Sequence, residues 1–461
     1  MNSKPNRLLL PLLFTGTLMG ALDLAIIGPA LPVLEVEFGL QQRQLAGLIN
    51  SYTLLQMLGA LLLAKIADRS GARLIYIISV LLFATGSLLL VAAQSEWMLF
   101  AGRSVQGFGA GGIFPAAAAV IGARFAPAER GKALGMLGAI WGLAFLVGPI
   151  LGGILLRFSW HWLFAINLPI AAVLIFGAVK LLPADPQRTP KPFDRRGLVV
   201  LMLTLGALIV AISKLDTNDV VASLTSVPVG GGLVALAVLV AVFWRVEKRA
   251  TDPIVKPALF ESAQITKACL ISAGVSAIQS GSIFLPALLV AALDMAAADV
   301  AFLLLPGVVA ATIGAPLFGR LINTTGTRLI LVGCQVLSLV AISVYAFVDL
   351  TLLTFIAASI VGGIGTSGLV GAPVRYIMLG EAGGEDRAAA QGLLSVVSSV
   401  GRLVGAAAVG AVAASLGGGA AGYQAAFAGL LGLGVLILFV ALSLEPKAVE
   451  QTKHATGGAP A

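Results

Sequence analysis

Charged residues are scarce in this chain and make up 11% of its 461 residues, whereas a soluble globular domain contains about 25%. Hydrophobic residues account for 59% of the sequence, and the mean hydropathy is +1.02. So few charges cannot cover the surface of a soluble protein of this length. The composition therefore excludes a soluble protein and predicts a polytopic membrane protein.

Residues that commonly carry chemistry are also rare, with two cysteines and two histidines in the sequence. Cys269 and Cys334 fall within apolar runs, which predicts buried thiols rather than a disulfide. No metal-ligand spacing, phosphate-binding loop or catalytic constellation occurs in the sequence. The glycine-rich run 107–112 lies within an apolar segment, where close helix packing explains it. We therefore expect neither an enzyme nor a bound metal or cofactor.

Long apolar runs dominate the sequence. A helix of about 20 apolar residues spans the hydrocarbon layer of a bilayer, and fourteen runs of this kind occur. The first run is too long for a signal peptide and lacks a small-x-small cleavage site, so we expect a retained helix. The predicted fold is an all-α membrane protein with helices near residues 8–32, 45–66, 74–93, 98–122, 133–156, 161–182, 197–213, 227–244, 268–292, 300–321, 328–348, 350–374, 388–414 and 422–444.

Basic residues divide unevenly between alternate connections, although the net charge is +8. When the N-terminus is placed inside, the inside segments hold 24 of the 29 Lys and Arg residues and the outside segments hold three. Arg103 and Arg402 remain within helices. This asymmetry follows the positive-inside rule. It predicts that both termini are cytoplasmic and that the basic charge does not indicate a nucleic-acid partner.

Two landmarks recur in the two halves of the sequence. Gly71 and Arg73 are matched by Gly326 and Arg328 at an offset of 255 residues. A second match has an offset of 257 residues and joins Arg130 and Gly135 to Arg387 and Gly392. The first six and last six helices are therefore predicted to be two copies of one unit, as in alternating-access transporters with a central site between parallel repeats.

The predicted domains follow from this repeat. An N-terminal six-helix bundle is expected at 1–182, and a C-terminal six-helix bundle at 262–445. Cytoplasmic linkers and an inserted helix pair occupy 183–261, and a disordered cytoplasmic tail occupies 446–461.

Six motifs at predicted helix ends resemble the major facilitator superfamily, specifically its fourteen-helix drug:proton antiporter branch. They all lie in the first half of the chain, at residues 22–32, 64–73, 103–110, 148–153, 160–169 and 193–197. Ala25, Gly28, Ala64 and His161 depart from the usual residues of that branch. The resemblance implies the major facilitator fold, with two six-helix bundles and two inserted helices. It also implies proton-coupled export of drugs, which is a cause of antibiotic resistance.

Asp23 is the one acidic residue that we place inside the bilayer, within the first apolar run. An acid there costs roughly 2.5–3.5 kcal/mol on insertion scales, so it usually faces a wet cavity or carries protons. Arg103, near the outer end of the fourth helix, is its expected partner. A protonation-dependent pair would couple proton binding to helix position, whereas a static pair would only join helices. We favour the coupling role.

The resemblance implies roles for two further groups. Asp68, Arg69, Gly71 and Arg73 form the predicted gating loop between the second and third helices. A carboxylate there can cap a facing helix N-terminus, although a solvated loop that obeys the charge rule is the alternative.

The antiporter motif provides a small-residue face that allows close helix approach, and in antiporters of this family such a face is thought to seal the interface between the halves. Ordinary helix packing is the alternative. The motif residues are Gly148, Pro149, Gly152 and Gly153.

The predicted substrate cavity includes Gln279, Arg402 and Trp141. Arg402 lies midway along the thirteenth helix. It suits a carboxylate or phosphate on a substrate, a counter-charge for Asp23, or a structural pair with backbone carbonyls. Trp141 can stack on a ligand, although core packing explains it equally well.

The predicted function is proton-coupled multidrug efflux of amphipathic organic compounds by alternating access. The alternative is a dedicated exporter of an anionic or zwitterionic metabolite or lipid-like compound, motivated by Arg402. A non-transporting receptor is disfavoured because the polar segments are short. The expected partners are a small amphipathic substrate, protons and membrane lipid. We expect a monomer in the cytoplasmic membrane of a prokaryote.

Overall fold

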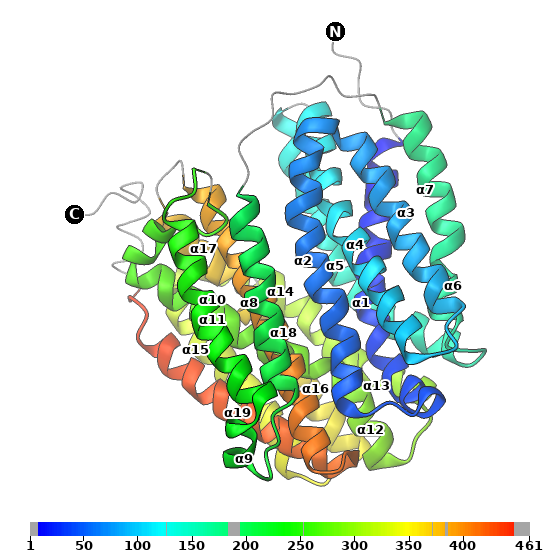
Figure 1. Cartoon of the computed structure of the whole chain (residues 1–461), viewed down its shortest axis with the longest axis vertical. Coiled ribbons are helices and arrows are strands. Elements are labelled where there is room, and N and C mark those ends of the chain that lie inside the picture. The colour runs from blue at the N-terminus through cyan, green and yellow to red at the C-terminus, as the bar shows by residue number, and fades with distance from the viewer. Residues whose placement is uncertain are drawn as a thin grey trace. The chain divides into compact units, whose positions relative to one another are not determined.

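The computed structural model describes residues 8–125, 127–182, 194–251, 253–370, 372–382 and 386–446. Within the helices it leaves some side chains undescribed, and those of Asp68, Arg69 and Trp141 are among them. The predicted tail lies outside the described residues, apart from its first residue, 446. Every regular element in the described part of the chain is helical (Figure 1).

The chain folds as two compact units. Unit 1 comprises 1–40, 47–193 and 297–302, and unit 2 comprises 41–46, 194–296 and 303–461. Most of unit 1 is built from α1 (Leu9–Phe38), α2 (Gln42–Ser70), α3 (Ala72–Val91), α4 (Glu96–Arg124), α5 (Pro127–Leu156), α6 (Trp162–Ala165), α7 (Asn167–Leu181) and α13 (Ala297–Leu303).

Unit 2 contains the remaining helices. They are α8 (Arg195–Ser213), α9 (Val220–Thr225), η1 (Val227–Gly231), α10 (Gly232–Glu247), η2 (Pro257–Glu261), α11 (Ala263–Gly281), η3 (Ser282–Phe284), α12 (Leu285–Leu293), α14 (Leu305–Thr325), α15 (Thr327–Phe347), α16 (Leu352–Leu369), α17 (Ala372–Glu381), α18 (Arg387–Ser415) and α19 (Gly419–Leu442). The domain limits predicted at 182 and 261 remain a prediction.

Thirteen helical segments of the described chain are long and apolar enough to cross a membrane, and α5 adds a shorter apolar helix at Leu146–Leu156. These segments correspond in order to the fourteen predicted runs. Several runs are interrupted, however. The run predicted at 268–292 is divided into α11, η3 and α12, with a proline in the first turn of α12. Proline fits a first turn because the N–H that it lacks has no partner there.

Glycines determine how closely the helices of unit 1 pack. A Cβ on Gly107 would overlap the backbone oxygen of Tyr52 on α2, and one on Gly109 would lie 2.5 Å from the backbone nitrogen of Phe83 on α3. Successive glycines of α4 therefore face different neighbours. Small residues allow backbones to approach in this way, so the glycine-rich run seats α4 between α2 and α3.

Unit 2 uses the same device between α11 and α18. Cβ atoms on Gly401 and Gly405 would overlap the backbone oxygens of Ala273 and Ala277. A hydrogen bond of 2.7 Å between the hydroxyls of Ser272 and Ser398 joins the same two helices. The helices α8 and α10 pack on each other, and α8 also packs on α18.

The two matched glycines of the sequence repeat share one backbone conformation. Gly71 precedes α3 with φ 87° and ψ 147°, and Gly326 precedes α15 with φ 80° and ψ 161°. Positive φ is costly for residues with a Cβ. The repeat is thus visible as the same glycine-dependent turn in each unit.

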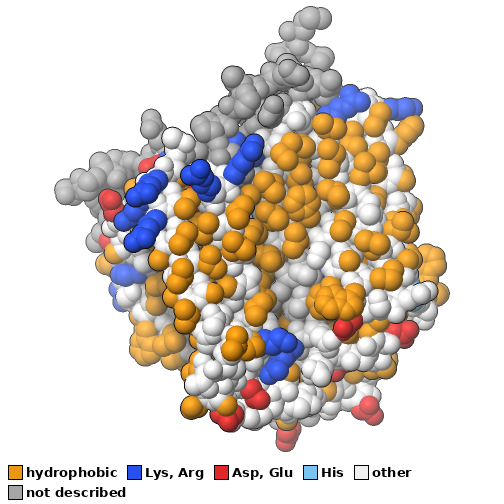
Figure 2. Space-filling view, in the orientation of Figure 1, with side chains coloured by type: hydrophobic (Ala, Val, Ile, Leu, Met, Phe, Trp, Pro, Cys, Tyr) orange, Lys and Arg blue, Asp and Glu red, His pale blue; other side chains and the backbone are white. Residues whose placement is uncertain are grey.

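The outward faces are largely hydrophobic, as expected for helices that contact lipid. Only 6% of the apolar window in the Val227–Glu247 span is buried. Figure 2 shows hydrophobic side chains along α8 and α10, with Lys and Arg gathered at the ends of these helices where α8 begins and α10 terminates. Basic residues at a helix end anchor it at a membrane surface.

Candidate functional site

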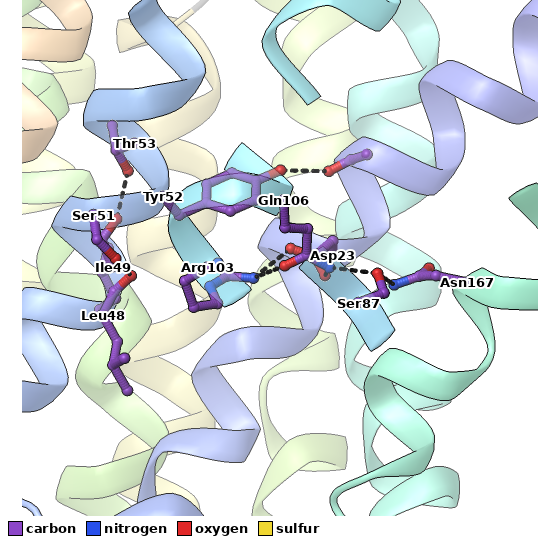
Figure 3. A network of polar contacts seen from close by, with 11 residues as sticks. Asp23, Leu48, Ile49, Ser51, Tyr52, Thr53, Ser87, Arg103, Gln106 and Asn167 are labelled. Carbon is purple, nitrogen blue, oxygen red and sulfur yellow. Dashed lines mark hydrogen bonds and ion pairs between the residues drawn. The ribbon is translucent and has the colours of Figure 1, made fainter. Parts of the chain in front are cut away.

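A buried polar network surrounds Asp23 in unit 1 (Figure 3). The side chain of Asp23 on α1 is 0% exposed. Its Oδ2 accepts a hydrogen bond of 2.6 Å from Arg103 Nη1, and its Oδ1 accepts one of 2.8 Å from Gln106 Nε2. Both oxygens of the carboxylate are therefore engaged by residues of α4. The structure brings Asp23 and Arg103 together, while their proton-coupling role stays a prediction.

Helix α4 presents Arg103 and Gln106 on one face because residues three apart are neighbours on a helix. Arg103 Nη1 also donates to Gln106 Oε1 at 2.8 Å, and Gln106 Nε2 donates to Ser87 Oγ of α3 at 2.9 Å. Ser87 Oγ accepts a second hydrogen bond, of 3.3 Å, from Asn167 Nδ2 at the start of α7. The network thus joins α1, α3, α4 and α7.

Tyr52 of α2 covers the arginine from another side. Its ring centroid lies 4.1 Å from Arg103 Cζ, and its hydroxyl donates to the backbone oxygen of Gly20 at 3.5 Å. Nε and Nη2 of Arg103 have no hydrogen-bond partner in the described structure. A guanidinium over an aromatic face gains a cation–π attraction. The buried arginine is therefore stabilised by one carboxylate, one amide and one ring.

The chemical consequence concerns a proton. A buried pair is stable only while both charges are present, because removal of one leaves the other uncompensated. Protonation of Asp23 would neutralise the carboxylate and leave Arg103, which is 1% exposed, with Gln106 and Tyr52 as its neighbours. The helices α1 and α4 would then lose the ionic part of their contact.

The other predicted groups lie elsewhere in unit 1. In the predicted gating loop, Gly71 provides the turn before α3, and Arg73 Nη2 donates to the backbone oxygen of Val179 on α7 at 2.8 Å. The side chains of Asp68 and Arg69 are outside the described residues, so their part in a latch stays a prediction.

The antiporter motif lies on α5, with Pro149 inside the helix. A Cβ on Gly148 would overlap the Cβ of Ala25 on α1, and one on Gly153 would lie 2.8 Å from the backbone oxygen of Ala298 on α13. Gly152 is less crowded, with its nearest neighbours at 3.8 Å. The motif therefore packs α5 closely on α1 and α13.

Two of the predicted cavity residues belong to unit 2. Arg402 and Gln279 lie on α18 and α11 of unit 2, and Arg402 Nη2 donates to Ser399 Oγ at 3.0 Å. No hydrogen bond joins Arg402 to Gln279 in the described part of unit 2. The side chain of Trp141 is outside the described residues.

Four members of the network were not singled out from the sequence, namely Tyr52, Ser87, Gln106 and Asn167. Gln106 belongs to the 103–110 motif but had no assigned role. Tyr52 follows Asn50 and Ser51, a short polar run inside an apolar helix, and that run was the available signal. Ser87 carries no signal of its own, because isolated serines are common in membrane helices. Asn167 belongs to the 160–169 motif but had no assigned role.

A model of the Major Facilitator Superfamily matches residues 13–284 and, in a second match, residues 268–461. The chain belongs to the Major Facilitator Superfamily. It is therefore a multi-pass membrane protein of a family of transporters, not of enzymes.

Two relatives of similar sequence come from Bacillus subtilis. The uncharacterized MFS-type transporter YfiU of Bacillus subtilis (strain 168) is 32% identical over 396 residues, which cover 84% of this chain and 76% of that protein. Multidrug resistance protein 3 of the same strain is 30% identical over 313 residues, covering 67% and 60%. The chain thus spans about three quarters of one relative's length and three fifths of the other's.

Solved structures confirm the all-helical major facilitator fold. A peptide transporter POT in complex with sulfate has a TM-score of 0.69 at 16% identity and covers 99% of this chain and 98% of its own. A bacterial homologue of the human lysosomal transporter Spinster, inward-facing and unoccupied, has a TM-score of 0.68 at 15% identity, with 98% of each chain covered. At these identities the likeness concerns the fold alone.

Proposed function

We propose that this transporter is a proton-coupled antiporter that exports amphipathic organic compounds by alternating access. We also propose that it belongs to the fourteen-helix drug:proton antiporter branch. The observation that carries the proposal is the fully buried Asp23, with both of its oxygens bound by Arg103 and Gln106. Two relatives named for multidrug resistance or transport, each about 30% identical, support drug export.

Asp23 is the proton carrier in this mechanism. A proton that reaches Asp23 removes the charge that holds Arg103 Nη1, and Gln106 can keep one hydrogen bond to the neutral carboxyl group. Breaking a buried ion pair costs about 3–5 kcal/mol, a free energy large enough to bias two arrangements of α1 and α4. Binding and release of the proton on opposite sides would then drive the change of access.

The surrounding features have supporting roles in the proposal. Asp68, Arg69, Gly71 and Arg73 act as a gating latch, and the bond from Arg73 to the Val179 oxygen ties the loop to α7. The glycines of the antiporter motif keep α5 close to α1. The protein is a monomer in a prokaryotic cytoplasmic membrane, with both termini inside. A dedicated exporter of an anionic or zwitterionic compound is a second candidate, favoured by Arg402.

The test uses liposomes that contain the protein, an acidic interior and a pH-sensitive dye. A panel of amphipathic cations and anions is added, and collapse of the gradient is recorded for wild type, Asp23→Asn and the control Asp349→Asn. Asp349 is exposed in the α15–α16 loop, so its neutralisation is expected to have no effect. Substrate-triggered collapse that Asp23→Asn alone abolishes would support proton antiport. Transport of substrates without any change in the gradient would exclude it.

A further inference from the structure

Arg402 occupies an unusual position for a cation in a membrane helix. It is the middle residue of the 27-residue span Ala389–Ser415 of α18. At 1.5 Å per residue, it lies about 20 Å from either end of the span. An arginine side chain can reach a membrane surface only from near a helix end. Its guanidinium therefore remains at the depth of the hydrocarbon layer.

Close packing holds this position in place. The glycines before and after it, Gly401 and Gly405, leave no room between α18 and the backbone of α11. The hydrogen bond between Ser272 and Ser398 fixes the two helices in the same register. Helix α18 therefore cannot slide along α11 to bring Arg402 closer to water at either end without losing these contacts.

Arg402 has no anionic partner among the residues that the structure describes. Its one side-chain hydrogen bond in the described structure goes to Ser399 Oγ, at 3.0 Å, although a guanidinium has five N–H donors. No Asp or Glu of the described chain forms an ion pair with it. The other arginine within a helix core, Arg103, is 1% exposed and paired with Asp23, whereas Arg402 is partly exposed.

The surroundings of Arg402 along α18 are polar. Gln391, Ser395, Ser399 and Arg402 are spaced by four, four and three residues, which places them on one face of the helix. Ser395 is exposed and Arg402 is partly exposed. A charged, polar stripe is too costly against hydrocarbon and instead faces protein or water. This face of α18 therefore offers an unpaired cation to whatever enters from the aqueous side.

We propose that Arg402 binds an oxyanion of the exported compound, so that the substrates are anionic or zwitterionic amphipaths that carry a carboxylate or a phosphate-like group. The guanidinium fork matches two oxygens of such a group. Ser399 is a positioning residue, since its hydroxyl oxygen accepts from Nη2 and orients the fork. This inference deepens the proposed function and rests on it for the direction of transport, but not for binding.

The experiment measures equilibrium binding to the full-length protein in phosphatidylcholine nanodiscs. The probes are dansyl-phenylalanine, a fluorescent amphipathic carboxylate, and its methyl ester, in which a neutral ester replaces the charged carboxylate. Arg402→Gln is expected to weaken binding of the acid about tenfold to a hundredfold, the range for hydrogen bonds to a charged group. Binding of the ester is expected to stay within about twofold, because the ester makes no charged contact.

Three further variants keep the result interpretable. Arg402→Lys retains the charge without the fork and is expected to give an intermediate loss for the acid. Ser399→Ala leaves Arg402 in place and is expected to weaken acid binding several-fold without affecting the ester. It serves as the test if Arg402→Gln does not fold. Arg245→Gln, at an exposed position of α10, is the matched control and should bind both probes like wild type.

Several outcomes would overturn the inference. The wild-type protein could bind neither probe or bind the ester more tightly than the acid. The Arg402→Gln variant could also lose affinity for both probes equally. An anionic lipid headgroup could supply the same chemistry, so the titration is repeated with phosphatidylglycerol. Competition by this lipid in wild type but not in Arg402→Gln would assign the site to lipid instead. Selective binding of the acid without proton flux would support the role of Arg402 in substrate binding and would refute only the antiport mechanism.

Discussion

The Asp23–Arg103 pair makes a quantitative prediction about stability. Removal of one partner from a buried pair costs about 3–5 kcal/mol, and Arg103 has few alternatives to the carboxylate, because its Nε and Nη2 lack hydrogen bonds in the described structure. Asp23→Asn and Arg103→Gln are each expected to cost about 3 kcal/mol. The double variant leaves no uncompensated charge and should cost less than either single change. The interaction energy would then exceed about 3 kcal/mol, beyond the upper end of the usual range for residues in contact.

Thermal unfolding in detergent can measure this interaction with a thiol-reactive fluorescent dye. Cys269 and Cys334 are free and buried, at 5% and 1% exposure, so they react when the protein unfolds. The order of midpoints should be wild type, then the double variant, then the two single variants. Asp349→Asn controls for the loss of an exposed acid. If the two single effects simply add in the double variant, the pair contributes no coupling and the reasoning about Asp23 is wrong.

Three other changes test the packing around the network. Tyr52→Leu removes the cation–π contact, which is worth about 2 kcal/mol where it is desolvated, and should reduce substrate-driven proton flux. Tyr52→Phe keeps the aromatic ring and should retain most of the proton flux. Gly107→Ala should lower the unfolding midpoint because its Cβ would overlap the Tyr52 carbonyl oxygen, but Gly333→Ala should not, since nothing lies within 4 Å of its Cβ. Gly71→Ala, at φ 87° and ψ 147°, should cost about 1–3 kcal/mol and lower the midpoint in the same thermal assay.

The number and order of the membrane helices could be predicted from the sequence because apolar runs and bilayer thickness are directly related. Asp23 and Arg103 could be singled out for a similar reason, since a charge inside such a run needs an explanation. The breaks within runs were missed. The division of α11 from α12 depends on the local backbone before Pro286, which hydropathy does not register.

The neutral part of the network could not be predicted in the same way. Which faces of α2, α3 and α7 turn toward Asp23 depends on the rotation of each helix about its axis. That rotation is set by contacts such as Gly107 with the Tyr52 carbonyl, and these contacts appear only in three dimensions. Ser87 and Asn167 therefore looked like ordinary polar residues of membrane helices, and their value to the site comes from position alone.

The charge of the substrate determines how the proposed exchange responds to voltage. One proton entering for one monovalent cation leaving moves no net charge. One proton entering for a zwitterion leaving moves one positive charge inward, and for a monovalent anion it moves the equivalent of two. Each charge contributes about 2.3 kcal/mol per 100 mV, so the membrane potential would drive anion export with about twice that free energy.

The test uses liposomes whose membrane potential is clamped with potassium and valinomycin. A voltage-independent exchange would contradict the role inferred for Arg402, because the compound moved would then be a cation. The alternative result is that the membrane potential accelerates the exchange, and that Arg402→Gln reduces this acceleration for carboxylates and for no other substrate. Such a result would show that the guanidinium on α18 and the proton site on α1 act in the same transport cycle.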